Sequence, residues 1–158
     1  MSREPALRIA AAAVALAGIA VAGYLTSAHY ADTPVVCVAG GACETVQESE
    51  YAEIARLPVA LLGLVAYSVV LALVLWDAPP ARLGAASIAF MGLLFGFYLL
   101  ALQVFVIDAI CSWCVVNDLL IGPALAVLTA LRLRSWGPGA GPSGRPGRGS
   151  PTGSRRCT

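Results

Sequence analysis

The sequence predicts an all-α integral membrane protein, built as a bundle of four transmembrane helices. Hydrophobic residues make up 59% of its 158 residues and charged residues only 12%, whereas soluble domains are about one-quarter charged. Several apolar runs reach the roughly 20 residues that a helix needs to cross a bilayer core. All ten basic residues are arginines, and they concentrate in the segments that flank the apolar runs. The length is that of a single domain.

The apolar runs divide into four segments of spanning length. The run from Leu83 to Leu131 is too long for one crossing, so we expect the chain to fold back at a corner near Asp108. Pro58 is expected at a helix start, where its missing N–H costs nothing. These segments form a membrane domain predicted over residues 1–134, with spans at about 7–28, 58–76, 84–106 and 109–131.

The first apolar run allows two interpretations. Arg3 and Arg8 precede it, as basic residues precede the apolar core of a signal peptide. The run is longer than a usual signal core, however, and no clear cleavage site follows it. We predict a retained transmembrane helix, with a cleaved signal as the alternative.

Two polar segments complete the chain. The outer loop at 29–57 contains Gly and Pro in its first half, whereas Glu44 to Ala55 has weakly amphipathic spacing and predicts a short helix lying on the membrane. After Arg132 the composition changes to Gly, Pro, Ser and Arg. Residues 135–158 are therefore predicted to be a disordered tail, because they have little to bury.

The arginines predict the orientation. With four spans, nine of the ten fall on one side of the membrane, and Arg56 alone falls on the other. The positive-inside rule makes the arginine-rich side cytoplasmic, together with both termini. The loop at 29–57 and the corner near Asp108 then face outward, on the side where disulfides form and persist.

Cys111 and Cys114 form a C-x-x-C pair at the predicted start of the fourth span. Three residues apart on a helix, they share one face, and unpaired N–H groups and the helix dipole favour a thiolate there. Asp108 is expected to cap this helix. A structural disulfide and half of a metal site are the alternatives. No metal site is predicted, because the only histidine, His29, is isolated in the sequence.

Cys37 and Cys43 form a second pair in the outer loop, with Gly40 and Gly41 between them. That flexible spacer allows a bridge to form and one sulfur then to reach a partner, as thiol–disulfide exchange requires. A static loop disulfide is the alternative. Two outward pairs together indicate a relay of electrons from a secreted thiol protein.

Such a relay needs an electron acceptor, and no haem, flavin or dinucleotide motif is present. A lipid-soluble quinone fits, because Cys114 lies where the fourth span enters the membrane. Asn117 and Asp118 follow just inside that span, where polar groups are candidates for function. Asp118 is a possible proton donor and Asn117 a possible hydrogen-bond partner of the quinone. Packing is the alternative role for the candidate aromatic pocket residues, which are Tyr67, Phe95, Phe97 and Tyr98.

Four motifs in order carry a resemblance to a known family: Cys37-x5-Cys43, Ser49-Glu-Tyr-Ala52, Leu57-Pro-Val-Ala-Leu-Leu-Gly-Leu-Val-Ala-Tyr67 and Cys111-Ser-Trp-Cys114. Over about residues 7–134 the chain resembles the bacterial branch of the vitamin K epoxide reductase family, in a stand-alone form without a fused thioredoxin-like domain. The resemblance implies a four-helix bundle around a quinone pocket, capped by the outer loop and its short helix.

The resemblance also implies roles for individual residues. Cys111 and Cys114 would be the active-site pair, with Cys114 next to the quinone, which is menaquinone or ubiquinone. Cys37 and Cys43 would be the shuttle pair, and which of them meets the partner stays open. Ser49 would lie near the quinone headgroup as a hydrogen-bond donor.

The chain departs from the family pattern at several positions. Arg56 replaces a common glycine. Val59 and Asp118 stand where the vertebrate enzymes carry Asn and Tyr, which favours quinone reduction over epoxide reduction. With no fused domain, the expected redox partner is a separate thioredoxin-fold protein of the DsbA-like type. Cys157, in the tail, has no counterpart.

The sequence thus predicts a membrane thiol–disulfide oxidoreductase that reoxidises a secreted DsbA-like oxidase and passes the electrons to a quinone. We expect it in the bacterial cytoplasmic membrane, with the cysteines on the outer face and no nucleic-acid partner. A small membrane metal carrier with paired cysteines is the main alternative. A DsbB-type oxidase, with its C-x-x-C in the first outer loop, and a purely structural membrane protein are the others.

Overall fold

The computed structural model describes residues 3–31, 33–37, 42–54 and 57–135. Its long helices are α1 (Arg3–Tyr30), α3 (Val59–Trp76) and α4 (Pro79–Leu102), and α4 continues into a π-helical turn, η3 (Gln103–Ile107). The last span consists of α5 (Ser112–Val116), a second π-helical turn η4 (Asn117–Ile121) and α6 (Gly122–Arg134). Within the described ranges, four helices are long and apolar enough to cross a membrane, namely Arg3–Tyr30, Val59–Trp76, Pro79–Ile107 and Ser112–Arg134.

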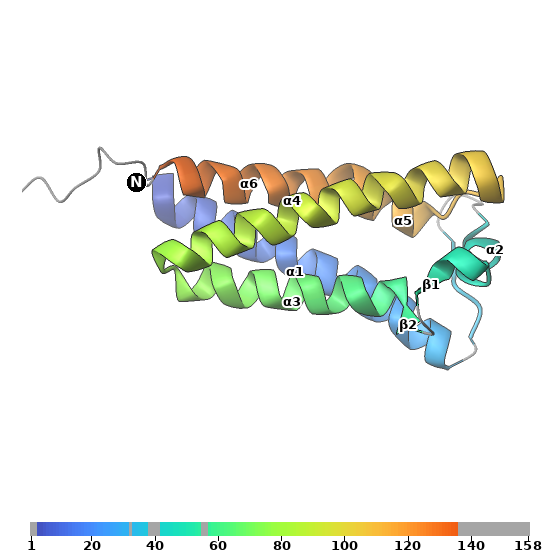
Figure 1. Ribbon diagram of the computed structural model, residues 1–158. Coiled ribbons are helices and arrows are strands. Elements are labelled where there is room, and N and C mark those ends of the chain that lie inside the picture. Colours follow the sequence, from blue (N-terminus) through green and yellow to red (C-terminus); the bar gives the residue numbers. More distant parts are fainter. Residues whose placement is uncertain (1–2, 32, 38–41, 55–56, 136–158) are drawn as a thin grey trace, which may run out of the picture.

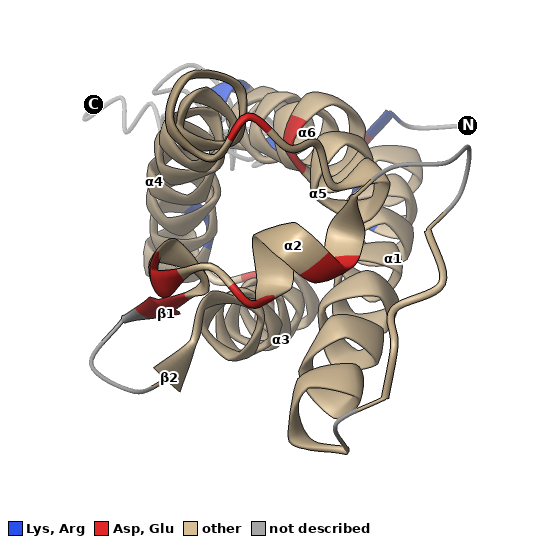
Figure 2. Ribbon diagram, turned by 90° about the vertical axis from the view of Figure 1, so that its right-hand side faces the viewer, with Lys and Arg blue, Asp and Glu red and all other residues tan. Residues whose placement is uncertain are grey.

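The four spans form a ring in which each packs on two neighbours. α1 lies against α3 and α6, and α4 lies against α3 and α6, as the side and end views show (Figure 1, Figure 2). Large apolar side chains such as Ile9, Phe90 and Phe105 remain exposed on the outside. An exposed apolar surface of this extent matches a protein solvated by lipid. The predicted all-α four-helix membrane bundle is therefore confirmed.

The helices pack most closely in the half of the bundle that is remote from the cysteines. Small and branched side chains form a buried core there, which allows the helix backbones to approach one another. Its members are Ala11, Ala15, Val70, Val74, Ala85, Ala89 and Leu125.

An ion-pair network lies at the same end of the bundle, which we call the arginine end. Asp77, in the turn between α3 and α4, accepts hydrogen bonds from Arg82 at 2.9 Å and from Arg132 at 2.7 Å. Arg8 of α1 lies 3.7 Å from the same carboxylate. Burial tends to raise the pKa of Asp77, but the hydrogen bond from Arg82 and the three arginine charges outweigh it and hold that pKa below its usual value. The network ties all four spans together.

The opposite end, which we call the cysteine end, is covered by the segment between α1 and α3. This segment contains α2 (Cys43–Gln47), a 3-10 turn η2 (Glu50–Ala52), and two short antiparallel strands, β1 (Glu53–Ile54) and β2 (Leu57–Pro58). α2 lies across the end of the ring of helices, and the acidic residues are concentrated around it (Figure 2).

The predicted short helix at Glu44–Ala55 is therefore only partly correct. The α-helix ends at Gln47, because Ser49 adopts an extended backbone at φ −69° and ψ 150°. The Ser49 hydroxyl donates to the carbonyl of Val46 at 2.7 Å, a local bond that competes with helix continuation. The two strands were not predicted. Pro58 lies at a helix start as predicted, because it is the N-cap of α3.

The corner between the third and fourth spans was predicted near Asp108, and the chain turns there. Asp108 has a left-handed backbone conformation (φ 52°) and ends the third span, with its N–H bonded to the carbonyl of Gln103. The prediction that Asp108 caps the following helix is wrong. Cys111 is the N-cap of α5, because its own sulfur accepts the N–H of Cys114.

Some of the features discussed from the sequence lie outside the described residues. They are Gly40 and Gly41 between the first two cysteines, Arg56, and the tail after Ser135, including Cys157.

Candidate functional site

The first cysteine pair is joined at the cysteine end of the bundle. Cys37 and Cys43 form a disulfide with their Cα atoms 5.8 Å apart. Cys43 begins α2 and is buried, and its N–H donates to the sulfur of Cys37 at 3.0 Å. The N–H of Ala42 donates to the carbonyl of Ile110 at 3.0 Å. This bond joins the segment that precedes α2 to the corner that carries the second pair.

The second pair consists of free thiols at the start of the fourth span. Cys111 is fully buried, and its N–H donates to Oε1 of Gln103 at 2.9 Å. A hydrogen bond from the Cys114 side chain, helped by the N–H groups of Cys114 and Trp113, lowers the pKa of Cys111 to about 7 in spite of burial. This hydrogen bonding favours the thiolate form of Cys111, which is the form that takes part in thiol–disulfide exchange.

The four cysteines meet in one cluster. Cys43 and Cys111 belong to a single buried group, and Cys37 and Cys114 pack against it. The paired cysteines predicted from the sequence are thus brought together, although some 70 residues separate them along the chain. This geometry makes exchange between the pairs possible without a long movement of either segment.

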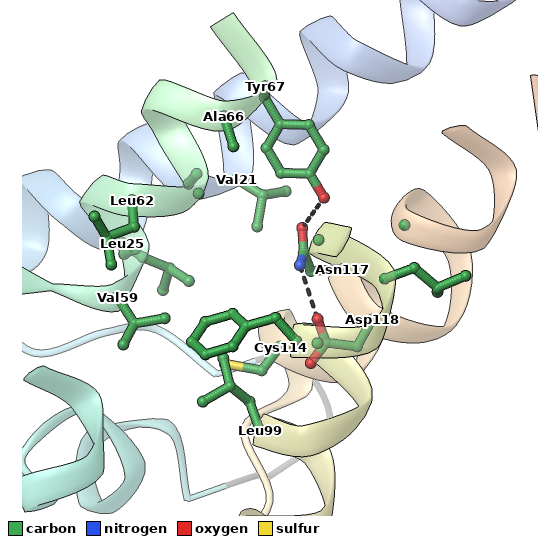
Figure 3. Close-up of a pocket in the computed structure, with 18 of the residues that line it drawn as sticks. Val21, Leu25, Val59, Leu62, Ala66, Tyr67, Leu99, Cys114, Asn117 and Asp118 are labelled. Carbon is green, nitrogen blue, oxygen red and sulfur yellow. Dashed lines mark hydrogen bonds between the residues drawn. The ribbon is translucent and has the colours of Figure 1, made fainter. Parts of the chain in front are cut away.

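A cavity of about 500 Å³ lies inside the ring of helices and next to this cluster. Its volume is in the range of pockets that bind drug-sized molecules. Val46, Ser49 and Tyr51 of the covering segment line one end, and Val70, Ala89 and Leu125 belong to both the cavity wall and the buried core. The walls are mostly aliphatic, and the sulfur-bearing residue Cys114 is part of them (Figure 3).

A chain of hydrogen bonds crosses one wall of the cavity. The hydroxyl of Tyr67 donates to Oδ1 of Asn117 at 2.8 Å, and Nδ2 of Asn117 donates to Oδ1 of Asp118 at 2.9 Å. Figure 3 shows the three side chains in a row beside Cys114. The structure thus brings together Tyr67, Asn117 and Asp118, three of the candidate residues named from the sequence.

Two glycines on neighbouring helices leave space for this chain of hydrogen bonds. The ring of Tyr67 lies over Gly18 of α1, where an added Cβ would be 2.6 Å from the ring. The carboxylate of Asp118 lies over Gly96 of α4, where an added Cβ would be 2.7 Å from Oδ1. All four spans therefore contribute to the position of the polar wall.

The remaining predicted residues have mixed outcomes. Ser49 and Phe95 line the cavity. The hydroxyl proton of Ser49 is used by the carbonyl of Val46, so in this arrangement the residue presents an acceptor rather than the expected donor. Tyr98 does not line the cavity. It is 56% exposed on the outer side of α4, where its ring contacts that of Phe95.

Gln103 is a site residue that the sequence analysis did not select. It is buried, it lines the cavity, and it accepts the N–H of Cys111 through its side chain and the N–H of Ala109 through its carbonyl. The available signal was an uncharged polar residue within the apolar run from Leu83 to Leu131. Such residues in spans usually need a partner inside the protein.

A sequence model of the Vitamin K epoxide reductase family matches residues 9–129. The chain belongs to this family. The match covers all four spans and both cysteine pairs, and membership makes the chain a membrane redox enzyme of the thiol–disulfide type. A comparison with curated proteins finds no match.

Val59 and Asp118, two positions at which the sequence was expected to depart from the family pattern, both line the cavity. Tyr67, Asn117 and Asp118 form its polar wall. Among the described residues, no cluster of three His, Cys, Asp or Glu side chains is arranged to hold a metal ion.

Proposed function

We propose that this protein reoxidises a separate thioredoxin-fold thiol oxidase of the DsbA-like type and uses a membrane quinone as the electron acceptor. Disulfide formation outside a bacterial cytoplasmic membrane would be the net result. One observation supports the proposal: Cys114 packs against the buried cluster that contains Cys43 and Cys111, and it also lines the cavity.

The shuttle pair receives electrons first. A thiolate of the reduced partner attacks one sulfur of the Cys37–Cys43 disulfide, so that this bond breaks and a mixed disulfide forms. The partner's second thiol then displaces the shuttle sulfur. The partner leaves with a disulfide, and Cys37 and Cys43 are left as thiols with the two electrons.

The second exchange transfers the electrons to the active-site pair. A thiolate of Cys37 or Cys43 attacks the oxidised Cys111–Cys114 pair, and the other shuttle thiol completes the exchange. The shuttle disulfide is restored, and Cys111 and Cys114 become thiols. The structure corresponds to this state, with the shuttle pair oxidised and the active-site pair free.

The cavity suits a quinone in size and lining, because it is apolar and has one polar wall. When bound, a quinone supplies a two-electron, two-proton acceptor for the active-site thiols. Asp118 would hold a proton at its carboxyl group beside the headgroup, and Asn117 and Tyr67 would orient that carboxyl group through their hydrogen bonds. The covering segment from Val46 to Ala52 would exclude water.

The direction across the membrane follows from the charges. Arg8, Arg82 and Arg132 lie at one end of the bundle, and acidic residues gather at the other (Figure 2). By the positive-inside rule, the arginine end and both termini would be cytoplasmic and the cysteine end would face outward.

The test is quinone reduction by the purified full chain, supplied with a reduced DsbA-like protein. We expect turnover in the wild type and in Cys157→Ser, and none in Cys114→Ser. Absence of wild-type turnover, combined with stoichiometric binding of a soft metal ion, would reject the proposal in favour of the metal-carrier alternative. Equal turnover in Cys114→Ser would also reject it.

A further inference from the structure

The backbone of Val36 is held on both sides of its Cα atom at the cysteine end. Its N–H donates to the hydroxyl of Tyr24 in α1 at 3.0 Å, and its carbonyl accepts Nε1–H of Trp113 at 2.9 Å. The Tyr24 and Trp113 rings contact each other, with centroids 5.7 Å apart and planes tilted by 59°. The two aromatic residues thus hold the N–H and the carbonyl of one residue, an arrangement which we call the Tyr24–Trp113 clamp.

The clamp links the two segments that carry the cysteine pairs through hydrogen bonds. Val36 directly precedes Cys37 of the shuttle pair, and Trp113 lies between Cys111 and Cys114. The side chain of Val36 is 72% exposed, so apolar packing of that side chain does not hold the segment. The hydrogen bonds to its backbone do, and their donor and acceptor side chains belong to α1 and to the C-x-x-C turn.

We propose that Tyr24 and Trp113 are positioning residues for disulfide exchange between Cys37–Cys43 and Cys111–Cys114. This inference rests on the relay described under the proposed function. In the exchange, a shuttle thiolate attacks a sulfur of the active-site disulfide, the S–S bond of that pair breaks, and the second shuttle thiol resolves the mixed disulfide. One dithiol is oxidised and one disulfide is reduced, so no outside oxidant is needed.

The physical reason is the geometry of sulfur exchange. The attacking thiolate must reach a particular sulfur along the S–S axis, and a fixed approach raises the rate of such a reaction in a manner similar to a high local concentration. Without the clamp, the segment from Thr33 to Cys37 would keep its disulfide but lose its fixed position over the C-x-x-C turn. Loss of one hydrogen bond of ordinary net strength would slow the exchange by about fivefold.

The experiment follows disulfide migration inside the full chain, with Cys157→Ser as the background and no quinone or partner added. Both pairs are first oxidised, and one equivalent of a small dithiol is then added. Samples are acid-quenched at intervals, alkylated, and analysed by peptide mass spectrometry. In the parent chain, thiols are expected at Cys37 and Cys43 first and at Cys111 and Cys114 later.

Tyr24→Phe removes only the hydroxyl, and Trp113→Phe removes the N–H donor while keeping an aromatic ring. Each is expected to slow migration by about fivefold without slowing the initial reduction of the shuttle pair. Because both side chains hold the backbone of the same residue and contact each other, the double variant is expected to be slower by less than the product of the two single effects. A general loss of structure would slow both steps alike.

Two controls separate the clamp from general disturbance. Val36→Ala changes the exposed side chain but not the peptide group, and Trp76→Phe alters an exposed tryptophan at the arginine end. In both variants, the disulfide is expected to migrate at the same rate as in the parent chain. Unchanged migration in Tyr24→Phe, or equal slowing in Val36→Ala, would overturn the inference. If the thiols in the parent chain stay at Cys37 and Cys43 and never appear at Cys111 and Cys114, the result would instead refute the proposed relay itself.

Discussion

The carboxylate of Asp118 lies directly against the backbone of Gly96. A Cβ added at Gly96 would be 2.7 Å from Oδ1 of Asp118, closer than non-bonded atoms approach, and 3.1 Å from its Cγ, which is an unusually tight contact. Asp118 is the only acidic residue among the described residues that line the cavity, and its position therefore depends on the absence of a side chain on a neighbouring helix.

Gly96→Ala is expected to displace Asp118 and to lower quinone reduction, with a loss of about 1–3 kcal/mol in the free energy of unfolding from overpacking. Gly23→Ala in α1 is the matched control, because Gly23 does not line the cavity and an added Cβ there would have no atom closer than 3.9 Å. It should keep activity and be equally or more stable, since Ala favours a helix over Gly. Thermal unfolding and turnover of the two variants decide the matter, and similar behaviour of both would refute the role given to Gly96.

Tyr67→Phe is expected to reduce turnover by removing the donor that orients Asn117. The Oδ1 atom of Asn117 would lose its 2.8 Å hydrogen bond, which costs about 1 kcal/mol or more for a partly buried group. Tyr98→Phe makes the same chemical change on the exposed side of α4 and should behave like the wild type. The measurement is quinone turnover of each variant at several quinone concentrations, and a loss in Tyr98→Phe equal to that in Tyr67→Phe would contradict the assignment.

The sequence was sufficient for features that depend on local spacing. Cys111 and Cys114 share the first turn of a helix because they are only three residues apart in the chain. The corner at Asp108 follows from the length of one apolar run, which is too long for a single crossing. The sequence was not sufficient for contacts between spans, such as that of Tyr67 with Asn117, which needs the relative register of two helices. Tyr98 was misplaced for a related reason: α4 is apolar all round, so its sequence does not reveal which face lines the cavity.

Cys111 is expected to titrate near pH 7 when both active-site thiols are reduced. Because a hydrogen bond from the Cys114 side chain is the main cause, Cys114→Ala should raise the pKa of Cys111 toward the ordinary value of about 8.5, whereas Cys114→Ser keeps a donor and should raise it less. Since the folded pKa is lowered, ionised Cys111 stabilises the fold above its ordinary pKa, and this contribution is lost as the pH falls through about 7. The ultraviolet absorbance of the thiolate, with Cys111→Ser as the blank, measures the titration. Equal pKa values in Cys114→Ala and the wild type would be inconsistent with this cause.

Asp77→Asn is expected to weaken the arginine end of the bundle without affecting the cysteine end. Asn tolerates the left-handed backbone conformation (φ 55°) that Asp77 adopts, so the change removes charge and not turn geometry. The side chain of Arg132, only 3% exposed, would lose its anionic partner. We expect a loss of about 2 kcal/mol in the free energy of unfolding, between the values for exposed and for buried ion pairs.

Asp108→Asn is the matched control for this variant, because Asp108 has a similar left-handed conformation (φ 52°) at the other end of the bundle. Its stability should stay within about 0.5 kcal/mol of the wild type. Because the arginines hold the pKa of Asp77 below its usual value, the contribution of the network is fully present near neutral pH and is lost only as the pH falls through that lowered pKa. Thermal unfolding in detergent as a function of pH tests this: the difference between wild type and Asp77→Asn should be constant near neutral pH and shrink in acid. A difference that grew in acid would contradict the network's stabilising role.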